Sequence, residues 1–341
     1  MSARPLCTAA ALAFALVASA LDASAAPVTL RFSSFEPPQA FITKEILTPW
    51  AERVTADSKG TLKIEMFAGG TLGRDPASQM KLVMNGVADI AWIVPGYTPG
   101  RFDQTTSVEL PFVVPNAYVG SVASWRMYEK GLWKGGGFDE IKPLCVCTSA
   151  PSVINTTYPA HDLADLKDHK FRGGGPVLLN VIKSLGGVPI GGITGPQLAE
   201  SLSRGLIDGT LNEWNSLQTF RALDVTKSHI VAPLGSLSLM VIMNKQKYAS
   251  LPPEAKAAID KNSGEAFSKL FGTMFDKNND AVFAKVKASK DHTVLILDKE
   301  QQKPWRAAIE PVYTDWKKST PNGDKLLQAL RDEVAAVEAG K

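Results

Sequence analysis

The chain has 341 residues, of which 45% are hydrophobic and 21% charged, and its formal net charge is +3. This length predicts about two domains, and the composition is that of an ordinary globular protein rather than a disordered or multi-span membrane protein. The nearly balanced charge argues against a nucleic-acid partner, which usually requires a basic patch. Three cysteines are too few for a disulfide scaffold or a cysteine zinc site, and we expect neither a metal nor another cofactor.

The N-terminal segment has the pattern of a secretory signal peptide. Arg4 precedes an almost wholly apolar run, Leu6 to Leu21, and the small residues Ala23-Ser24-Ala25 follow it. The run is shorter than the ~20 residues that a membrane-spanning helix needs, so a signal peptide is favoured over a membrane anchor. We therefore expect residues 1–25 to be removed and the rest of the chain to reside in the periplasm.

The next part of the chain alternates strands with helices. The apolar patterns predict strands at 28–34, 61–67 and 89–94, separated by helices at 40–54 and 75–85. A βαβαβ order is typical of a parallel α/β sheet. We assign residues 26–150 to a first lobe, lobe 1.

The same kind of pattern restarts further along the chain. A strand that ends at Arg172 is followed by three glycines, and further elements are predicted as a helix at 176–185, a strand within 186–190, a helix at 197–204 and a strand at 206–212. Two similar halves predict two α/β lobes with a cleft between them. We assign residues 151–237 to lobe 2.

The last third of the chain is mainly helical. Amphipathic helices are predicted at 254–289, 300–317 and 325–338, with strands at 239–244 and 291–297. We expect the strand at 239–244 to return to lobe 1. The whole segment from about residue 238 onward is expected to follow it and to brace that lobe.

Two cysteines remain after the predicted signal peptide. Cys145 and Cys147 are two residues apart in an apolar segment, so a bridge between them in a strand would be strained. We expect two buried thiols in a core strand.

The motifs of common exported enzymes are absent from the sequence. The four histidines are scattered, with no H-E-x-x-H pair, and no G-x-S-x-G elbow occurs. Ser78 to Lys81 fits S-x-x-K, but the partner motifs of the serine acyl-enzymes are missing. We therefore expect a binding protein rather than an enzyme, with an exported hydrolase or lyase as the alternative.

Two polar residues lie at the carboxyl ends of predicted strands, where α/β sheets hold their ligands. Arg172 precedes three glycines, and Asn212 precedes Glu213. The planar guanidinium of an arginine can hold a carboxylate with two parallel hydrogen bonds. A surface ion pair of Arg172 with Asp165 or Asp168 is the competing interpretation.

A series of short motifs resembles one transport family along nearly the whole chain after residue 25. They are, in order, Gly60–Phe67 with Leu72-Gly73, Gly86–Ala91, Leu110–Phe112, Asp165–Arg172 and Leu202–Gly209. Together they resemble the DctP-like periplasmic solute-binding subunit of tripartite ATP-independent periplasmic (TRAP) transporters. The resemblance implies a two-lobed periplasmic binding protein with strands crossing between the lobes, a long brace helix and a ligand held in the cleft. It also implies closure on the ligand and delivery to the membrane subunits of a TRAP permease.

The family motif places two ligand-binding roles on this sequence. The arginine that grips the substrate carboxylate corresponds to Arg172, and the asparagine near that carboxylate corresponds to Asn212. Members that bind sugar acids or small polar acids often carry a second arginine, and the matching position here is Ser152. Polar positions of such members correspond to Phe35 and Val94, and a bulky aromatic position corresponds to Gly195.

These differences predict a pocket that has lost charge, gained apolar surface and gained room. Tyr97, in a loop bounded by glycine and proline, and Trp214, two residues after Asn212, are further candidate ring faces, whereas Trp92 in its apolar strand is more typical of the core. The expected ligand is an aromatic or hydrophobic monocarboxylate, with a C4-dicarboxylate or 2-oxo acid as the alternative. A ligand sensor for a signalling protein is a further alternative, and a monomer is expected.

Overall fold

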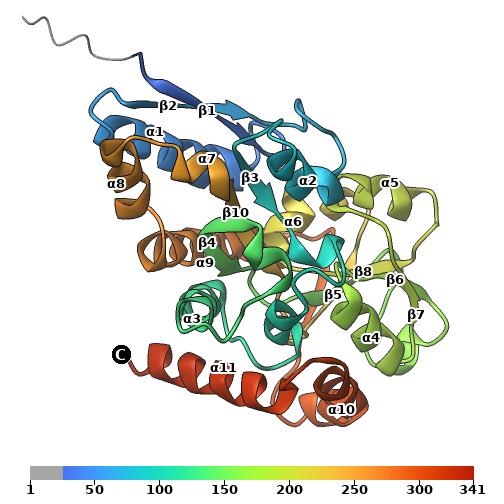
Figure 1. Ribbon diagram of the computed structural model, residues 1–341. Coiled ribbons are helices and arrows are strands. Elements are labelled where there is room, and N and C mark those ends of the chain that lie inside the picture. Colours follow the sequence, from blue (N-terminus) through green and yellow to red (C-terminus); the bar gives the residue numbers. More distant parts are fainter. Residues whose placement is uncertain (1–25) are drawn as a thin grey trace, which may run out of the picture.

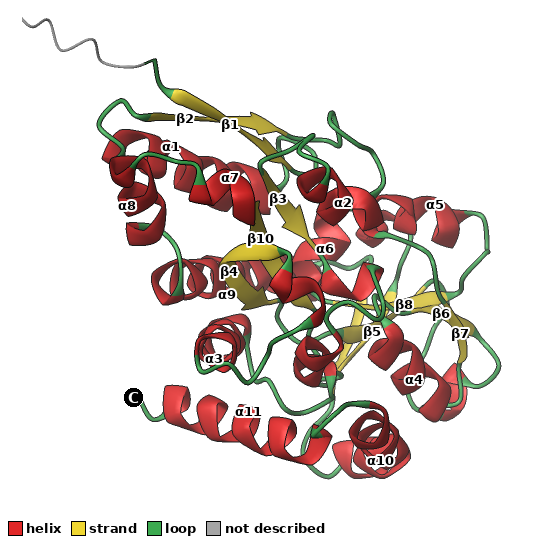
Figure 2. Ribbon diagram, viewed as in Figure 1, coloured by secondary structure: helices red, strands yellow, loops and turns green. Residues whose placement is uncertain are grey.

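The computed structural model describes residues 26–341, so the predicted signal peptide lies outside the described residues. Two mixed β-sheets form the centres of two lobes, and helices cover both (Figures 1 and 2). The predicted two-lobed α/β architecture is confirmed.

The sheet of lobe 1 has five strands in the order β2-β1-β3-β10-β4. Strands β1, β2 and β3 run parallel, as their helical crossovers require, whereas β10 is antiparallel to both β3 and β4. Each residue of β3 is buried, which accounts for its continuous apolar sequence. The strands are β1 Val28–Ser33, β2 Leu62–Phe67, β3 Ile90–Ile93, β4 Ile141–Thr148 and β10 Ser238–Asn244.

The sheet of lobe 2 has six strands in the order β11-β9-β5-β8-β6-β7. The strands are β5 Val153–Thr156, β6 Lys170–Arg172, β7 Val188–Ile190, β8 Gly209–Asn212, β9 Ser228–Val231 and β11 Thr293–Ile296. The expectation that the whole segment after about residue 238 returns to lobe 1 is wrong for β11, which pairs in parallel with β9. The reason is that a long preceding helix carries the chain across to lobe 2 before β11 begins.

An antiparallel ribbon joins the two sheets. One crossing runs from β4 to β5 and the other from β9 to β10, and backbone hydrogen bonds pair them between the lobes. Ser152 N donates to Gly235 O over 2.7 Å, and Leu234 N donates to Ser152 O over 3.0 Å. Ser149 N donates to Leu237 O over 3.0 Å. Movement of one lobe against the other therefore has to bend this paired ribbon.

Helices pack on both sheets and along the side of the molecule. In lobe 1, a π-helical segment, Ile42–Leu47, continues into α1 where the sequence predicts one helix. Figure 1 shows α10 beside α4 of lobe 2 and α11 beside α3 of lobe 1, so the C-terminal helices also bridge the lobes. The helices are α1 Thr48–Asp57, α2 Gln79–Met84, α3 Ala117–Glu129, α4 Pro176–Ser184, α5 Leu198–Ser203, α6 Trp214–Thr219, α7 Lys245–Ala249, α8 Pro253–Lys261, α9 Glu265–Ala288, α10 Gln302–Ser319 and α11 Gly323–Glu338.

Helix α9 is the brace that the sequence predicts, although it is shorter than expected. The predicted helix at 254–289 divides into α8 and α9 at Gly264, whose positive φ of 75° ends the continuous helical path. The N-terminal half of α9 packs on lobe 1, where the Phe267 ring stacks on Trp50 at a centroid distance of 5.2 Å. The C-terminal half packs on lobe 2, where the Asn279 side-chain oxygen accepts a hydrogen bond from Trp214 N at 3.0 Å. With 24 residues and a length of about 36 Å, α9 reaches across both lobes.

The interior of lobe 1 holds the two remaining cysteines. Cys145 and Cys147 lie on β4, both are fully buried and neither forms a disulfide. The prediction of two buried thiols in a core strand is confirmed.

The crossing ribbon offers a test of how tightly it is packed. Gly235 has a φ of 102°, and a Cβ atom there would lie 2.0 Å from the backbone oxygen of Glu109. Gly235→Ala is expected to lower the free energy of unfolding by about 3 kcal/mol, because backbone strain and a backbone clash add. Gly131→Ala is the matched control, since Gly131 has a φ of 68° and open space around it. That control is expected to lose only about 1 kcal/mol. Equal losses in urea unfolding would contradict the packing described for the ribbon.

Candidate functional site

A small cavity lies where the two lobes, the crossing ribbon and helix α9 meet. Its volume is about 40 Å³, well below the roughly 150 Å³ that holds a benzene molecule in a protein core. A ring-sized ligand therefore requires lining side chains or whole lobes to move. The lining residues are Phe35, Glu36, Ile42, Trp92, Val94, Tyr97, Ser149, Gly195, Asn212, Glu213, Asn215, Ser216, Phe220, Leu237, Leu239 and Phe275.

Arg172, the last residue of β6, is fully buried beside this cavity. Its Nε donates to Ile193 O over 2.9 Å, its Nη1 to Asn212 Oδ1 over 3.2 Å and its Nη2 to Tyr97 Oη over 3.1 Å. These three acceptors are neutral. Among the ion pairs of residues 26–341, none involves Arg172, so the competing prediction of a surface pair with Asp165 or Asp168 is wrong.

Asn212, the last residue of β8, holds its side-chain amide in a fixed orientation. Its Oδ1 accepts from Arg172 and also from Thr210 Oγ1 at 2.6 Å, while its Nδ2 donates to Ser216 Oγ over 3.0 Å. The parallel register that pairs Arg172 with Thr210 brings the ends of β6 and β8 together. The two polar residues that the sequence places at strand ends are therefore in direct contact.

Tyr97, a residue of lobe 1, is hydrogen-bonded to lobe 2. It ends a short helical turn after β3, and its hydroxyl oxygen accepts hydrogen bonds from Arg172 Nη2 and from Gly195 N, each at 3.1 Å. The neighbouring Gly96 lies against the loop of three glycines, Gly173–Gly175, in lobe 2. A Cβ atom on Gly96 would lie 2.8 Å from Gly174 O. The lobes are thus in contact at this point, as in a closed binding protein.

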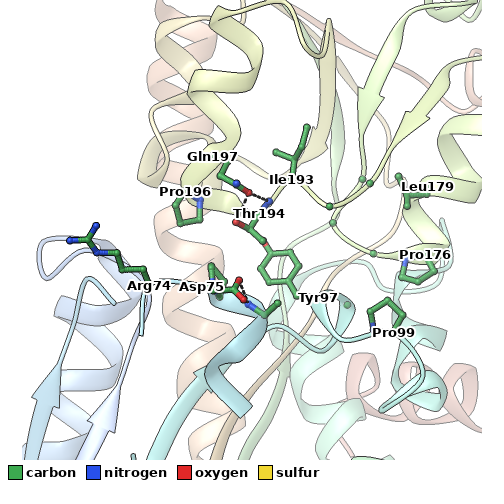
Figure 3. Close-up of a pocket in the computed structure, with 18 residues that line it drawn as sticks. Arg74, Asp75, Tyr97, Pro99, Pro176, Leu179, Ile193, Thr194, Pro196 and Gln197 are labelled. Carbon is green, nitrogen blue, oxygen red and sulfur yellow. Dashed lines mark hydrogen bonds between the residues drawn. The ribbon is translucent and has the colours of Figure 1, made fainter. Parts of the chain in front are cut away.

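A wider pocket of about 620 Å³ opens on the outer side of Tyr97 (Figure 3). Residues of both lobes line it, with Asp75 and Pro99 on the lobe 1 side and Thr194 and Gln197 on the lobe 2 side. Tyr97 lines this pocket and the inner cavity alike. Tyr97 therefore lies at the boundary between the two spaces.

The apolar wall contains residues that the sequence assigns to the pocket. Phe35, just after β1, and Val94, just after β3, both line the cavity and are almost fully buried. Trp92 belongs to the core, as expected, because its ring lies 5.4 Å from that of Phe271, but it also lines the cavity. Its indole Nε1 donates to Glu36 Oε1 over 3.3 Å.

Two residues that the sequence assigns to the pocket, Trp214 and Ser152, do not line the cavity. Trp214 is not among the lining residues, because β8 ends at Asn212 and helix α6 begins at Trp214, so strand alternation no longer applies. Its ring packs instead on His229 and Phe283, with centroid distances of 5.0 and 5.2 Å. Ser152 is buried within the crossing ribbon and does not line the cavity.

Gly195 lines the cavity but does not enlarge it. A Cβ atom at Gly195 would lie 2.4 Å from the ring of Phe220, which fills the space that a larger side chain would occupy. The predicted gain in room is therefore wrong at this position. The sequence analysis does not name Phe220 as a pocket residue. Its position directly after α6, close to Asn212 in the sequence, is the feature that could have indicated it.

Sequence reasoning did not identify two buried carboxyl groups, those of Glu36 and Glu213, that line the cavity. Burial raises the pKa of Glu36 to about 8, against the hydrogen bond from Trp92, and the nearby Glu213 adds to the rise. Burial also raises the pKa of Glu213, whereas hydrogen bonds from Ser216 and the charge of Arg172 lower it. Both glutamates directly follow predicted pocket residues, Phe35 and Asn212. This adjacency in the sequence is the feature that could have indicated their place in the pocket.

A third buried glutamate lies at the hinge rather than in the cavity. A Cβ atom on Gly175 would be 3.0 Å from Glu109 Oε2, and one on Gly96 would be 3.5 Å from Glu109 Oε1. The carboxyl group of Glu109 therefore sits between the two lobes. Burial raises its pKa to about 8, with the backbone of Ser238 opposing the rise.

Glu109 yields a prediction about stability and pH. A carboxyl with a normal pKa of 4.5 in the unfolded chain and about 8 in the folded chain holds more protons when folded, so stability falls as pH rises between these values. Between pH 5.5 and 8.5 the Tm of the wild-type protein is expected to fall more steeply than that of Glu109→Gln. Glu338→Gln, which changes an exposed glutamate, is the control and should follow the wild type. Parallel curves for wild type and Glu109→Gln in differential scanning calorimetry would contradict the assignment.

Within residues 26–341, no group of three His, Cys, Asp or Glu side chains is arranged to hold a metal ion. In the same part of the chain, none of the helices combines the length and hydropathy needed to cross a membrane.

The fold and the cavity define a two-lobed binding protein that encloses its ligand between α/β lobes. A family model described as bacterial extracellular solute-binding protein, family 7 (DctP), matches residues 32–319. The chain belongs to this family, whose TRAP members are periplasmic solute-binding proteins and not a class of enzymes.

Three similar proteins illustrate the relationship. A curated relative from Comamonas testosteroni, named outer membrane transporter protein TsaT, is 29% identical over 98% of both chains. A TRAP solute-binding protein from a marine metagenome, described as specific for aromatic acid ligands and solved with 3-hydroxybenzoate, is 32% identical with a TM-score of 0.85, covering 91% of this chain and 98% of the other. A TRAP solute-binding protein from Rhodoferax ferrireducens, solved with copurified benzoate, is 28% identical with a TM-score of 0.86, covering 92% of this chain and all of the other.

Proposed function

We propose that this protein is the periplasmic receptor of a TRAP transporter and captures an aromatic or hydrophobic monocarboxylate through Arg172 and Asn212. The observation that supports this most strongly is the buried guanidinium of Arg172, which is hydrogen-bonded to neutral oxygens. The proposed receptor delivers its acid to the membrane subunits of a TRAP permease.

The electrostatic argument starts from the cost of burying a charge. A cation taken out of water without a paired anion is strongly unfavourable, and a ligand carboxylate restores the missing partner. The hydrogen bonds to Ile193, Asn212 and Tyr97 use three of the five guanidinium N–H donors. The remaining donors are available for a carboxylate, and the fork geometry of arginine favours two parallel bonds.

The walls of the cavity favour a ring over a second charged group. Phe35, Trp92, Val94 and Phe220 supply apolar and aromatic surface, and the described residues that line the cavity include no Lys, Arg or His. A C4-dicarboxylate would place its second carboxylate near Glu36 and Glu213 without a cation to balance it. The aromatic acids bound by the two similar solved proteins support the same ligand class.

Closure follows from the placement of the binding groups on both lobes. Arg172 and Asn212 belong to lobe 2, while Phe35, Val94 and Tyr97 belong to lobe 1. A ligand that touches both lobes binds the closed state better than the open one and shifts the population toward it. The Tyr97 hydroxyl, which joins the lobes through Arg172, is the lobe 1 contact that must adjust as a carboxylate enters.

The ligand class is tested with purified, ligand-free protein and a panel of organic acids. Benzoate, cinnamate and phenylpyruvate are expected to raise the Tm and to bind in isothermal titration calorimetry, because each combines one carboxylate with an apolar body. Succinate and malate are expected to bind at least tenfold more weakly. Tight binding of succinate or malate, with no response to any aromatic acid, would contradict the proposed ligand class.

The carboxylate grip is tested at Arg172. Arg172→Met is expected to weaken binding of the best aromatic acid by more than about 100-fold, the size expected when a buried charge pair loses one partner. Arg172→Lys keeps the charge but loses the forked guanidinium, so its affinity is expected to lie between those of the wild type and Arg172→Met. Arg221→Met, at an exposed arginine of lobe 2, is the matched control and should bind as the wild type does. Unchanged affinity in folded Arg172→Met would remove Arg172 from the site.

A further inference from the structure

We propose that Glu36 determines specificity by binding a hydroxyl group on the acid that Arg172 holds, so that the preferred ligand is a hydroxylated aromatic monocarboxylate. This inference rests on the proposed function and names the substrate class within it. It assigns a role to a buried carboxyl group that the carboxylate grip does not use.

The geometry of Glu36 leaves one oxygen without a partner. The residue is 4% exposed, and it lines the cavity beside Trp92. Its Oε1 accepts the indole hydrogen of Trp92 over 3.3 Å, which fixes the orientation of the carboxyl group. Its Oε2 is buried and has no hydrogen-bond partner among residues 26–341. Because buried polar atoms are nearly always hydrogen-bonded, this oxygen marks a place for a polar group of a ligand.

The other polar side chains of the cavity wall each have at least one hydrogen-bond partner within the protein. Glu213 accepts from the backbone and side chain of Ser216, at 2.9 and 2.6 Å. Asn212 is held by three side chains, and Asn215 accepts from Asn278 Nδ2 at 2.7 Å. Ser149 donates to Ala150 O and accepts from Leu237 N. Among the acidic groups that line the cavity, Glu36 is thus the one with an unused oxygen.

A hydroxyl group fits this oxygen better than other ligand groups do. With a pKa of about 8, the carboxyl of Glu36 is mainly protonated at neutral pH and both donates and accepts hydrogen bonds. A hydroxyl also does both, so it pairs with Glu36 in either protonation state. A second carboxylate would meet the nearby Glu213, and an ammonium group would require Glu36 to ionise in a buried place.

The positions of the two groups divide recognition between the lobes. Glu36 follows β1 of lobe 1, whereas Arg172 ends β6 of lobe 2. A ligand with its carboxylate on Arg172 and its hydroxyl on Glu36 makes a hydrogen bond to each lobe. An analogue without the hydroxyl leaves Glu36 unpaired in the closed state, and a site built to bind a hydroxyl discriminates strongly against such an analogue.

The test compares hydroxyl with methyl groups of similar size. Affinities for the three hydroxybenzoates and the three methylbenzoates are measured by isothermal titration calorimetry at pH 7. At least one hydroxybenzoate is expected to bind the wild-type protein ten or more times tighter than the methylbenzoate substituted at the same position. In Glu36→Leu this preference is expected to disappear or reverse, because leucine accommodates the methyl group and cannot pair with the hydroxyl.

Two further variants keep the outcome decisive. Glu36→Gln preserves shape and hydrogen-bonding capacity, so it is expected to retain a preference for the hydroxyl even if Glu36→Leu folds poorly. Glu109→Gln changes a buried glutamate outside the cavity and is expected to leave the hydroxyl-to-methyl ratio unchanged.

The results separate this inference from the proposed function. Equal binding of hydroxybenzoates and methylbenzoates, or an unchanged ratio in Glu36→Leu, overturns the role of Glu36 while the aromatic acid receptor stands. Tighter binding of an aminomethylbenzoate than of the matching hydroxybenzoate also overturns the hydroxyl assignment. Absence of binding by every aromatic acid overturns the proposed function, and the role of Glu36 with it.

Discussion

The buried guanidinium of Arg172 is the group around which the cleft is organised. Its hydrogen bonds gather the end of β8 through Asn212, the loop of lobe 2 through Ile193 and the turn of lobe 1 through Tyr97. A charge in this position needs oriented acceptors on several sides, and elements from both lobes supply them. The contact between the lobes and the proposed binding of an anion therefore involve the same side chain.

The two lobes around this group are connected by the crossing ribbon and by α9. The crossing ribbon is hydrogen-bonded across the hinge, and α9 packs on lobe 1 through Phe267 and on lobe 2 near Trp214. The proposed opening of the cleft would therefore have to bend the ribbon and shift α9 against one lobe. Gly96 and Gly174 permit the backbones of the two lobes to approach closely when the cleft shuts.

The sequence predicts the strands and the strand-end residues well because both depend on local patterns. Arg172 and Asn212 were identifiable since parallel strands place their carboxyl ends together. Trp214 was misplaced because alternation along a strand says nothing about where the strand ends, and only the start of α6 decides that. The assignment of β11 failed because the direction in which α9 leaves lobe 1 is a property of tertiary packing. Phe220 and Gly195 show the same limit, since the space next to a glycine depends on a side chain 25 positions away.

The proposed binding of an anion has to be reconciled with the two acidic residues that line the cavity. Burial raises the pKa values of Glu36 and Glu213, so their negative charge is weakened in the place where it would repel a carboxylate. Glu213 keeps hydrogen bonds from Ser216 and lies in the field of Arg172, which favours its ionised form. In the proposed complex, the carboxylate of the ligand supplies the anionic partner that the guanidinium of Arg172 lacks within the protein. A ligand with two carboxylates would add a negative charge that no Lys, Arg or His among the described lining residues offsets, so the charge balance supports the proposed preference for a monocarboxylate.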